Sequence, residues 1–169
     1  MNIDCKIPRY KTAISRNKVS KPVRLALLNN LINKATTVFD YGCGRGKDVE
    51  YLNQLDIKSF GYDPYYFPKN DIITSDVVML NYVINVIENL EERINVIRDS
   101  LIISKSILLI SVRLKKELPK VFTPFNDGII TRKGTFQKFF DQTELEDWLN
   151  KITGFLPIKL TGGIVYLVK

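Results

Sequence analysis

The stretch of sequence that decides the fold reads Val38-Phe39-Asp40-Tyr41-Gly42-Cys43-Gly44-Arg45-Gly46. A β-prone run over residues 36–40 leads into three alternate glycines, and apolar residues then recur at helical spacing over residues 47–55. Glycine lets the backbone turn sharply and approach a ligand closely. The start of a helix directs unpaired backbone N–H groups at such a ligand. The stretch therefore predicts a strand, a ligand-binding loop and a helix.

An acidic residue ends the next predicted strand, residues 58–63. Asp63 stands 17 residues after Gly46, where a carboxylate can accept hydrogen bonds from both hydroxyls of a ribose. The dinucleotide fingerprint requires glycine or alanine at the sixth position counted from Gly42, and that position is Lys47. The loop and the acid therefore indicate a nucleoside ligand, but the dinucleotide fingerprint fails.

Helical and β-prone segments alternate after residue 20. Ser20 and Pro22 mark a helix start, and residues 76–80 and 107–112 are apolar runs suited to buried strands. The helix between these runs has Glu88, Glu91, Glu92 and Arg93 off its apolar stripe, which consists of Ile87, Leu90, Ile94, Ile97 and Leu101.

The C-terminal part adds a helix and a hairpin. A capping box over residues 143–146 starts the helix, and Gly162 and Gly163 separate two β-prone runs, residues 155–160 and 164–168. The whole order predicts an α/β fold of the Rossmann-like kind, with a mostly parallel sheet, helices on both faces and a C-terminal antiparallel hairpin.

The segment of residues 114–142 reads as irregular and mixes lysine and arginine with five phenylalanines. Such a mixture suits contact with a nucleic-acid backbone and base stacking, so the segment is a candidate lid. For each ring taken singly, a place in the core is the more common alternative.

The spacing acid-x-Gly-x-Gly-x-Gly, together with Asp63, resembles the first motif of class I S-adenosylmethionine-dependent methyltransferases. By that resemblance Gly42 and Gly44 would lie against the methionine and ribose parts of S-adenosylmethionine, with Tyr41 and Gly46 in the same loop. Asp40 would brace the loop and help to hold the methionine ammonium, directly or through water. Asp63 would hold the ribose, and Asn81 would meet the methionine end through its backbone.

The sequence departs from that class after Asp63. Only residues 64–75 separate Asp63 from the next strand, too few for the helix and strand that these enzymes usually insert there. We therefore expect the sheet to lack its usual third-strand edge. Asp71 is the candidate adenine contact from a loop. Pro64, with the two tyrosines after it, is a candidate for packing on adenine, the alternative being a plain hydrophobic cover.

Seven strings together are similar to one narrower family, the DNA phosphorothioation-associated methyltransferases of bacteria. The strings are residues 7–16 (IPRYKTAISR), 20–24 (SKPVR), 39–46 (FDYGCGRG), 63–66 (DPYY), 81–87 (NYVINVI), 127–131 (DGIIT) and 135–138 (TFQK). Members of that family are longer, so this chain would match only their methyltransferase region. The resemblance implies a setting in DNA modification and defence.

Familiar catalytic signatures are missing from the sequence. A base-amino methyltransferase shows Asp/Asn-Pro-Pro-aromatic where this chain has residues 81–84 (NYVI), neither cysteine follows a proline as in a cytosine-C5 enzyme, and a histidine base is excluded because the chain has no histidine. Tyr82 and Asn85 are left as candidates to orient an acceptor beside the cofactor; alternatively Asn85 caps the next helix and Tyr82 packs beneath it. Arg113 could bind a phosphate or carboxylate or form a salt bridge.

Length and composition fit one ordinary domain. The 169 residues are enough for a substantial core, no apolar run approaches the ~20 residues that span a bilayer, and the first residues lack an apolar signal core. We therefore expect a cytoplasmic protein that does not enter membranes. Cys5 and Cys43 are too few for a disulfide framework, and without histidine a zinc site lacks its usual ligands, so no metal is expected.

The net charge of +7 is concentrated at the N-terminus. Residues 1–24 hold seven lysines and arginines against Asp4, a net +6, which leaves +1 for the other 145 residues. We expect a basic arm of residues 1–19, with Lys11 and Arg16 as candidate nucleic-acid contacts, followed by one domain of residues 20–169. The alternative is a solvated, poorly ordered terminus.

The sequence therefore favours an S-adenosylmethionine-dependent methyltransferase with nucleic acid as the leading acceptor class. A cofactor-binding module or sensor without transferase activity, and a small-molecule methyltransferase, are the alternatives.

Overall fold

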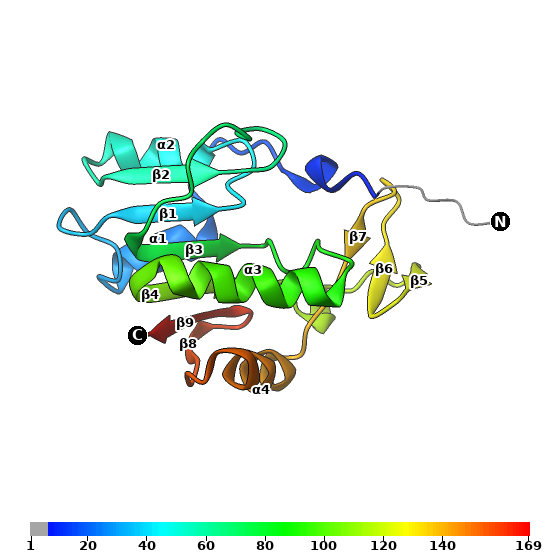
Figure 1. Cartoon of the computed structure of the whole chain (residues 1–169). Coiled ribbons are helices and arrows are strands. Elements are labelled where there is room, and N and C mark those ends of the chain that lie inside the picture. The colour runs from blue at the N-terminus through cyan, green and yellow to red at the C-terminus, as the bar shows by residue number, and fades with distance from the viewer. Residues whose placement is uncertain (1–6) are drawn as a thin grey trace.

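A computed structural model describes residues 7–169, and it contains one large sheet with the strand order β2-β1-β3-β4-β9-β8 (Figure 1). The strands β2, β1, β3 and β4 pair with one another in parallel, whereas β9 is antiparallel to both β4 and β8. The strands are β1 (Val38–Tyr41), β2 (Ser59–Tyr62), β3 (Ser75–Asn81), β4 (Ser104–Ser111), β8 (Ile158–Thr161) and β9 (Ile164–Val168). The predicted α/β fold is confirmed, and so is the missing edge, because β2 is the outermost strand on its side.

Helices cover both faces of this sheet. They are α1 (Lys21–Leu28), α2 (Lys47–Gln54), α3 (Leu90–Ile103) and α4 (Gln142–Thr153), with short 3₁₀ helices at Arg9–Thr12 and Lys115–Glu117. Successive side chains of a strand point to opposite faces. In β3 this sends Val77 and Met79 into one core with α1 and α2, and Val78 and Leu80 into the other with α3 and α4.

Two helix starts differ in detail from the sequence patterns. Asn89 caps α3 by accepting a hydrogen bond from the backbone N–H of Glu92 at 2.9 Å, so the alternative role of Asn85 as a helix cap is wrong. The capping box of α4 uses Asp141 and Glu144, two residues earlier than residues 143–146. In both cases several capping residue types stand close together, and only the backbone path selects one.

The position of Arg93 differs more strongly from the prediction made from the sequence. The apolar stripe of α3 predicts that it lies outside the core, yet its side chain is 0% exposed while Leu90 is 53% exposed. The first turn of α3 is covered by a separate small sheet, so the face that helical spacing assigns to solvent is buried there.

That small sheet comes from the segment predicted to be irregular. It has the order β5-β6-β7, all antiparallel, with β5 (Thr123–Phe125), β6 (Gly128–Ile130) and β7 (Phe136–Gln137). Of the five phenylalanines in the segment, Phe136 and Phe140 are buried, as the core alternative requires, whereas Phe122 and Phe125 are exposed. Figure 1 shows the small sheet beyond the carboxyl ends of β1 and β3, so it lies at the end of the large sheet where ligands bind in open α/β folds.

Candidate functional site

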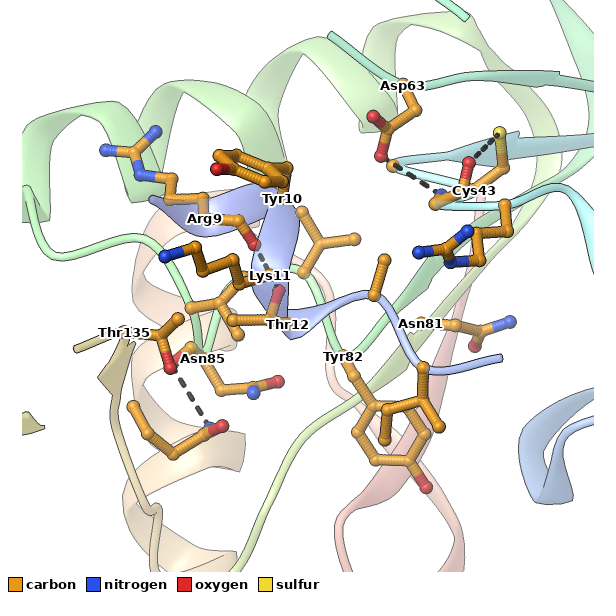
Figure 2. Close-up of a pocket in the computed structure, with 18 of the residues that line it drawn as sticks. Arg9, Tyr10, Lys11, Thr12, Cys43, Asp63, Asn81, Tyr82, Asn85 and Thr135 are labelled. Atoms are coloured by element: carbon orange, nitrogen blue, oxygen red, sulfur yellow. Dashed lines mark hydrogen bonds between the residues drawn. The ribbon is translucent and has the colours of Figure 1, made fainter. Parts of the chain in front are cut away.

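An open cleft of about 1840 Å³ lies at the carboxyl ends of the parallel strands (Figure 2). Its walls come from the glycine loop, the residues that follow β2 and β3, the N-terminal residues 7–21, and the turn between β6 and β7. These five segments are separated in the sequence. The parallel topology brings the glycine loop and the residues after β2 and β3 to one edge of the sheet, and the N-terminal residues and the β6–β7 turn complete the walls there.

The glycine loop is held in place by backbone hydrogen bonds. The N–H groups of Gly42 and Cys43 both donate to the carbonyl of Tyr62, at 2.8 and 3.0 Å. Gly42 has φ +83°, and an added Cβ would stand 2.6 Å from Cγ2 of Val83. Gly46, with φ +72°, is the N-cap of α2 and packs against Phe67, but it does not line the cleft. The loop therefore requires glycine at position 42 on steric grounds alone.

Asp63 joins the loop to the end of β2. Its Oδ2 accepts the N–H of Gly44 at 3.0 Å, and its Oδ1 accepts the N–H groups of Tyr65 and Tyr66, both at 2.9 Å. The side chain is half-buried and lines the cleft, as does Pro64. An ionised carboxylate has about four acceptor positions, so Asp63 organises its own loop and keeps capacity for a ligand hydroxyl.

For Asp40, the resemblance implies a brace for the glycine loop and a contact to the methionine ammonium, made directly or through water. Asp40 is 2% exposed and does not line the cleft, and its Oδ1 has no hydrogen-bond partner among the described residues. Burial raises its pKa well above the usual range, the nearby charge of Asp48 raises it further, and Arg16 opposes both. Direct contact between Asp40 and a bound methionine group is therefore not supported. Tyr41, by contrast, lines the cleft.

Asp71 is also away from the cleft. It is exposed and absent from the cleft walls, so a direct adenine contact is not supported. The chain after Asp63 turns back at once, with the N–H of Phe67 donating to the carbonyl of Asp63 at 3.0 Å. Asn70 then donates to the carbonyl of Gly61 at 2.8 Å. The short connection is used to cover the outer edge of β2.

The arm from residue 7 onward forms one wall of the cleft. Arg9 makes ion pairs with Glu88 at 2.8 Å and Glu92 at 2.5 Å. The ring of Tyr10 stacks on Tyr65 with centroids 4.1 Å apart and planes 9° from parallel. Ala13 lies over Gly44, 3.2 Å from the position of an added Cβ. The arm therefore covers the glycine-loop end of the cleft. Cys5 and the other residues before 7 lie outside the described part of the chain.

The predicted basic contacts have different surroundings. Lys11 is exposed, lines the cleft and makes no ion pair with the described residues. Arg16 also lines the cleft, but it pairs with the buried Asp48 at 3.3 Å. Arg113 pairs with Glu117 at 3.1 Å and lies over the Tyr82 ring at 5.9 Å, so the salt-bridge alternative describes it. Of the three, Lys11 is the one available to an anionic ligand.

Asn81, the last residue of β3, and Tyr82, which follows it, both line the cleft. Tyr82 has φ +60°, a left-handed conformation that is rare outside glycine and is concentrated at functional sites. Its backbone N–H donates to the carbonyl of Ser111 at 2.9 Å, and the hydroxyl of Ser111 donates to Oδ1 of Asn81 at 3.3 Å. Burial raises the pKa of Tyr82, against the opposing charge of Arg113, so the phenol stays protonated at neutral pH.

Asn85 lies in the same cleft with a buried amide. It is 1% exposed, and its Oδ1 has no hydrogen-bond partner among residues 7–169. Figure 2 shows its side chain directed into the cleft. Its backbone carbonyl accepts hydrogen bonds from the N–H of Lys138 at 2.7 Å and from Nε2 of Gln137 at 3.2 Å.

The structure adds wall residues that the sequence does not single out as site residues. Arg45 comes from the glycine loop, Thr131, Arg132, Lys133 and Thr135 come from the turn between β6 and β7, and Gln137 comes from β7. The strings around residues 127–138 contributed to the family resemblance, but no local pattern places them beside Asn85.

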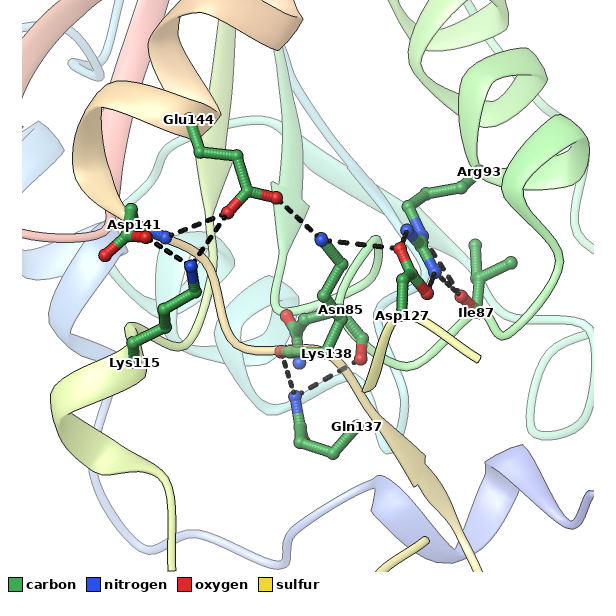
Figure 3. Close-up of polar contacts among 9 residues, drawn as sticks. All are labelled: Asn85, Ile87, Arg93, Lys115, Asp127, Gln137, Lys138, Asp141 and Glu144. Carbon is green, nitrogen blue, oxygen red and sulfur yellow. Dashed lines mark hydrogen bonds and ion pairs between the residues drawn. The ribbon is translucent and has the colours of Figure 1, made fainter. Parts of the chain in front are cut away.

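A chain of ion pairs supports this side of the cleft (Figure 3). The Arg93 guanidinium binds Asp127 at 2.6 and 3.1 Å and the carbonyl of Ile87 at 2.7 and 3.1 Å. Lys138 continues the chain from Asp127 at 3.3 Å to Glu144 at 2.7 Å. The small sheet is thereby tied to both α3 and α4.

These ion pairs predict a loss of stability in acid. Burial alone would raise the pKa of Asp127 and of Glu144, but hydrogen bonds and charges from Arg93 and Lys138 outweigh it and hold both values below the ordinary 3.8 and 4.5. Carboxylates with a depressed pKa stabilise the fold above their unfolded pKa, and that contribution is lost as pH falls through the folded values. We expect the thermal unfolding midpoint to fall as pH drops below about 4.5. An Asp127→Asn, Glu144→Gln double variant should show a shallower fall, and an identical fall in both proteins would contradict the prediction.

Two further features limit the chemistry of the cleft. Burial raises the pKa of the Cys43 thiol, as do the charges of Asp40 and Asp63, so Cys43 is a neutral loop residue. Between residues 7 and 169 no group of three or more histidine, cysteine, aspartate or glutamate side chains is arranged to hold a metal ion.

Among the helices of residues 7–169, none has the length and hydrophobicity to cross a bilayer.

The strand order, the glycine loop after β1 and the acid after β2 define the class I S-adenosylmethionine-dependent methyltransferase fold. Comparison with solved structures agrees. A 1,6-didemethyltoxoflavin-N1-methyltransferase from Burkholderia thailandensis, solved with its substrate and S-adenosylhomocysteine, is 15% identical with a TM-score of 0.59, over 96% of this chain and 77% of its own.

Two further solved structures have the same fold. A sugar N-methyltransferase from Streptoalloteichus is 10% identical with a TM-score of 0.60, over 95% of this chain and 86% of its own. An S-adenosylmethionine-dependent methyltransferase from Aquifex aeolicus is 18% identical with a TM-score of 0.59, over 95% of this chain and 96% of its own. No protein-family model matches the sequence, and no curated protein matches it significantly. Nothing in these comparisons points to the phosphorothioation-associated family or to a nucleic-acid substrate.

Proposed function

We propose that this protein is an S-adenosylmethionine-dependent methyltransferase. The observation that carries the proposal is the Asp63 carboxylate, which is bonded to the N–H of Gly44 and lines the cleft at the glycine loop. Its remaining acceptor capacity fits a ribose hydroxyl, and the cleft is large enough to hold a cofactor and an acceptor together. When bound, S-adenosylmethionine supplies a methyl group on an electrophilic sulfonium.

The residues of the cleft would bind the cofactor and orient the methyl acceptor. Gly42, Gly44 and Tyr41 would border the methionine and ribose parts, and Asn81 would meet the methionine end. Tyr82 keeps its proton at neutral pH, since the ordinary pKa of tyrosine is already 10.0 and burial raises the pKa of Tyr82 further, so it can donate a hydrogen bond but is no general base. Placement of the acceptor in line with the methyl group is then the main catalytic contribution of this cleft.

Nucleic acid is the acceptor class that we propose. Six cations line the cleft without an ion pair to the described residues: Lys11, Lys18, Lys21, Arg45, Arg132 and Lys133. Unpaired cations around one cleft favour a polyanion. The resemblance of the seven sequence strings to phosphorothioation-associated methyltransferases adds a DNA-modification setting to this proposal.

Binding and transfer measurements test the proposal. We expect S-adenosylhomocysteine to bind with micromolar affinity in calorimetric titration, and labelled methyl groups from S-adenosylmethionine to enter single-stranded DNA or RNA. Absence of binding to a folded protein would refute the methyltransferase function. Binding without transfer to any acceptor would favour a cofactor-binding module or sensor. Transfer only to uncharged small molecules would favour a small-molecule methyltransferase.

A further inference from the structure

The end of the cleft near the small sheet has a feature that the cofactor site does not use. Asn85 is 1% exposed, it lines the cleft, and its amide oxygen lacks a partner among the described residues. Buried polar atoms are nearly always hydrogen-bonded, and exceptions indicate a functional role or a missing partner. The amide is therefore suited to a ligand that brings its own hydrogen-bonding groups.

The backbone of Asn85 is held by β7 and the residue that follows it. The N–H of Lys138 and the side-chain amide of Gln137 both donate to the backbone carbonyl of Asn85, at 2.7 and 3.2 Å. The Lys138 ammonium is fixed in turn by Asp127 and Glu144 (Figure 3). These bonds fix the Asn85 backbone, and with it the position from which the side-chain amide points into the cleft (Figure 2), as a preorganised recognition group requires.

Cations rim this same end of the cleft. The turn between β6 and β7 is closed by the N–H of Gly134, which donates to the carbonyl of Thr131 at 2.9 Å, and it presents Arg132 and Lys133. Both side chains are exposed and form no ion pair within residues 7–169. Lys11 lines the cleft from the arm.

We propose that this end of the cleft is an acceptor subsite for one unpaired nucleotide. The Asn85 amide recognises the base edge, since an amide offers both a donor and an acceptor. Arg132, Lys133 and Lys11 bind the adjacent phosphates. A base within a duplex cannot reach a side chain that is 1% exposed, so the ligand is single-stranded or extruded from the helix. The subsite rests on the proposed function and names its substrate class.

Fluorescence anisotropy with a short, labelled, mixed-sequence single-stranded oligonucleotide tests the subsite, with and without S-adenosylhomocysteine. Charge reversal in Arg132→Glu, Lys133→Glu is expected to weaken binding at least ~10-fold. The control Lys151→Glu, Lys159→Glu makes the same charge change on exposed residues away from the cleft and should weaken it less than ~2-fold by screening.

A second pair of variants tests the amide itself. Asn85→Ala is expected to weaken oligonucleotide binding about 5- to 10-fold, as loss of a base contact does, while Asn95→Ala, exposed on α3, should leave it unchanged. Thermal unfolding and S-adenosylhomocysteine titration of each variant separate misfolding from loss of the subsite.

Several outcomes would overturn the subsite. They are equal losses in both charge-reversal variants, unchanged affinity in a folded Asn85→Ala protein, tighter binding of duplex than of single strand, and no oligonucleotide binding at all. Each of these leaves the methyltransferase proposal standing if S-adenosylhomocysteine binds. Conversely, oligonucleotide binding that depends on Asn85 and Arg132 without any S-adenosylhomocysteine binding would support the subsite and refute the methyltransferase.

Discussion

Replacement of Asp63 by alanine is expected to weaken S-adenosylhomocysteine binding about 100-fold, equivalent to about 2.7 kcal/mol. A hydrogen bond from a ribose hydroxyl to a charged carboxylate contributes about 1.5–3 kcal/mol. The substitution also leaves the N–H groups of Gly44, Tyr65 and Tyr66 without their acceptor, so the loop that borders the ligand loses its anchor. Calorimetric titration of the variant and wild type measures the difference.

Asp71→Ala is the matched control for this experiment. It removes the same charge from an exposed residue that does not line the cleft, only eight positions further along the chain. Its affinity for S-adenosylhomocysteine should stay within about 2-fold of wild type, since screened surface charges contribute little. Equal losses in the two variants would mean that general electrostatics, and not the site at β2, determines the affinity.

Replacement of Arg93 by methionine is expected to lower the free energy of unfolding by about 3 kcal/mol. The Arg93 side chain is 0% exposed, and it binds both oxygens of Asp127 and the carbonyl of Ile87. Methionine fills much of the volume but leaves the Ile87 carbonyl unpaired and Asp127 with Lys138 alone. Urea denaturation followed by circular dichroism measures the change.

The control is Arg98→Met, an exposed position on the same helix. It should change the free energy of unfolding by less than about 0.5 kcal/mol, as surface substitutions usually do. If Arg93→Met changes the free energy of unfolding as little as Arg98→Met does, the ion-pair chain does not stabilise the fold. The inference that this chain supports the position of Asn85 would then be wrong.

The elements of the large sheet could be predicted from sequence because their signals are local. Residues 36–63 contain a strand, the three alternate glycines of the loop, a helical repeat and an acid in the order that the fold requires, and the structure follows that order. The missing edge could be predicted as well, because residues 64–75 are too short to form another helix and strand. The spacing of apolar residues and the length of the connecting segment are sufficient for such inferences.

The side chains of the site were less predictable. The resemblance gives Asp40 a loop-bracing role and a contact to the methionine ammonium, directly or through water, and the structure places its side chain outside the cleft wall. The helical stripe predicts that Arg93 faces solvent, and the structure buries it in an ion-pair chain. The strand that contains Asp40 and the helix that contains Arg93 were both predicted correctly from sequence. Asp40 is buried because it stands in β1, between the neighbouring strands β2 and β3. Arg93 is buried because a segment distant in sequence, the small sheet with Asp127, covers it.

The sequence by itself determined the class of fold, the position of the glycine loop and the acid at its edge. Only the tertiary structure decided that the basic arm lies along the cleft and that Asn85 meets Gln137 across 52 residues. The physical reason is that helices, strands and turns depend on interactions between near neighbours. A contact between distant segments instead depends on how whole elements pack, and no short-range pattern records that.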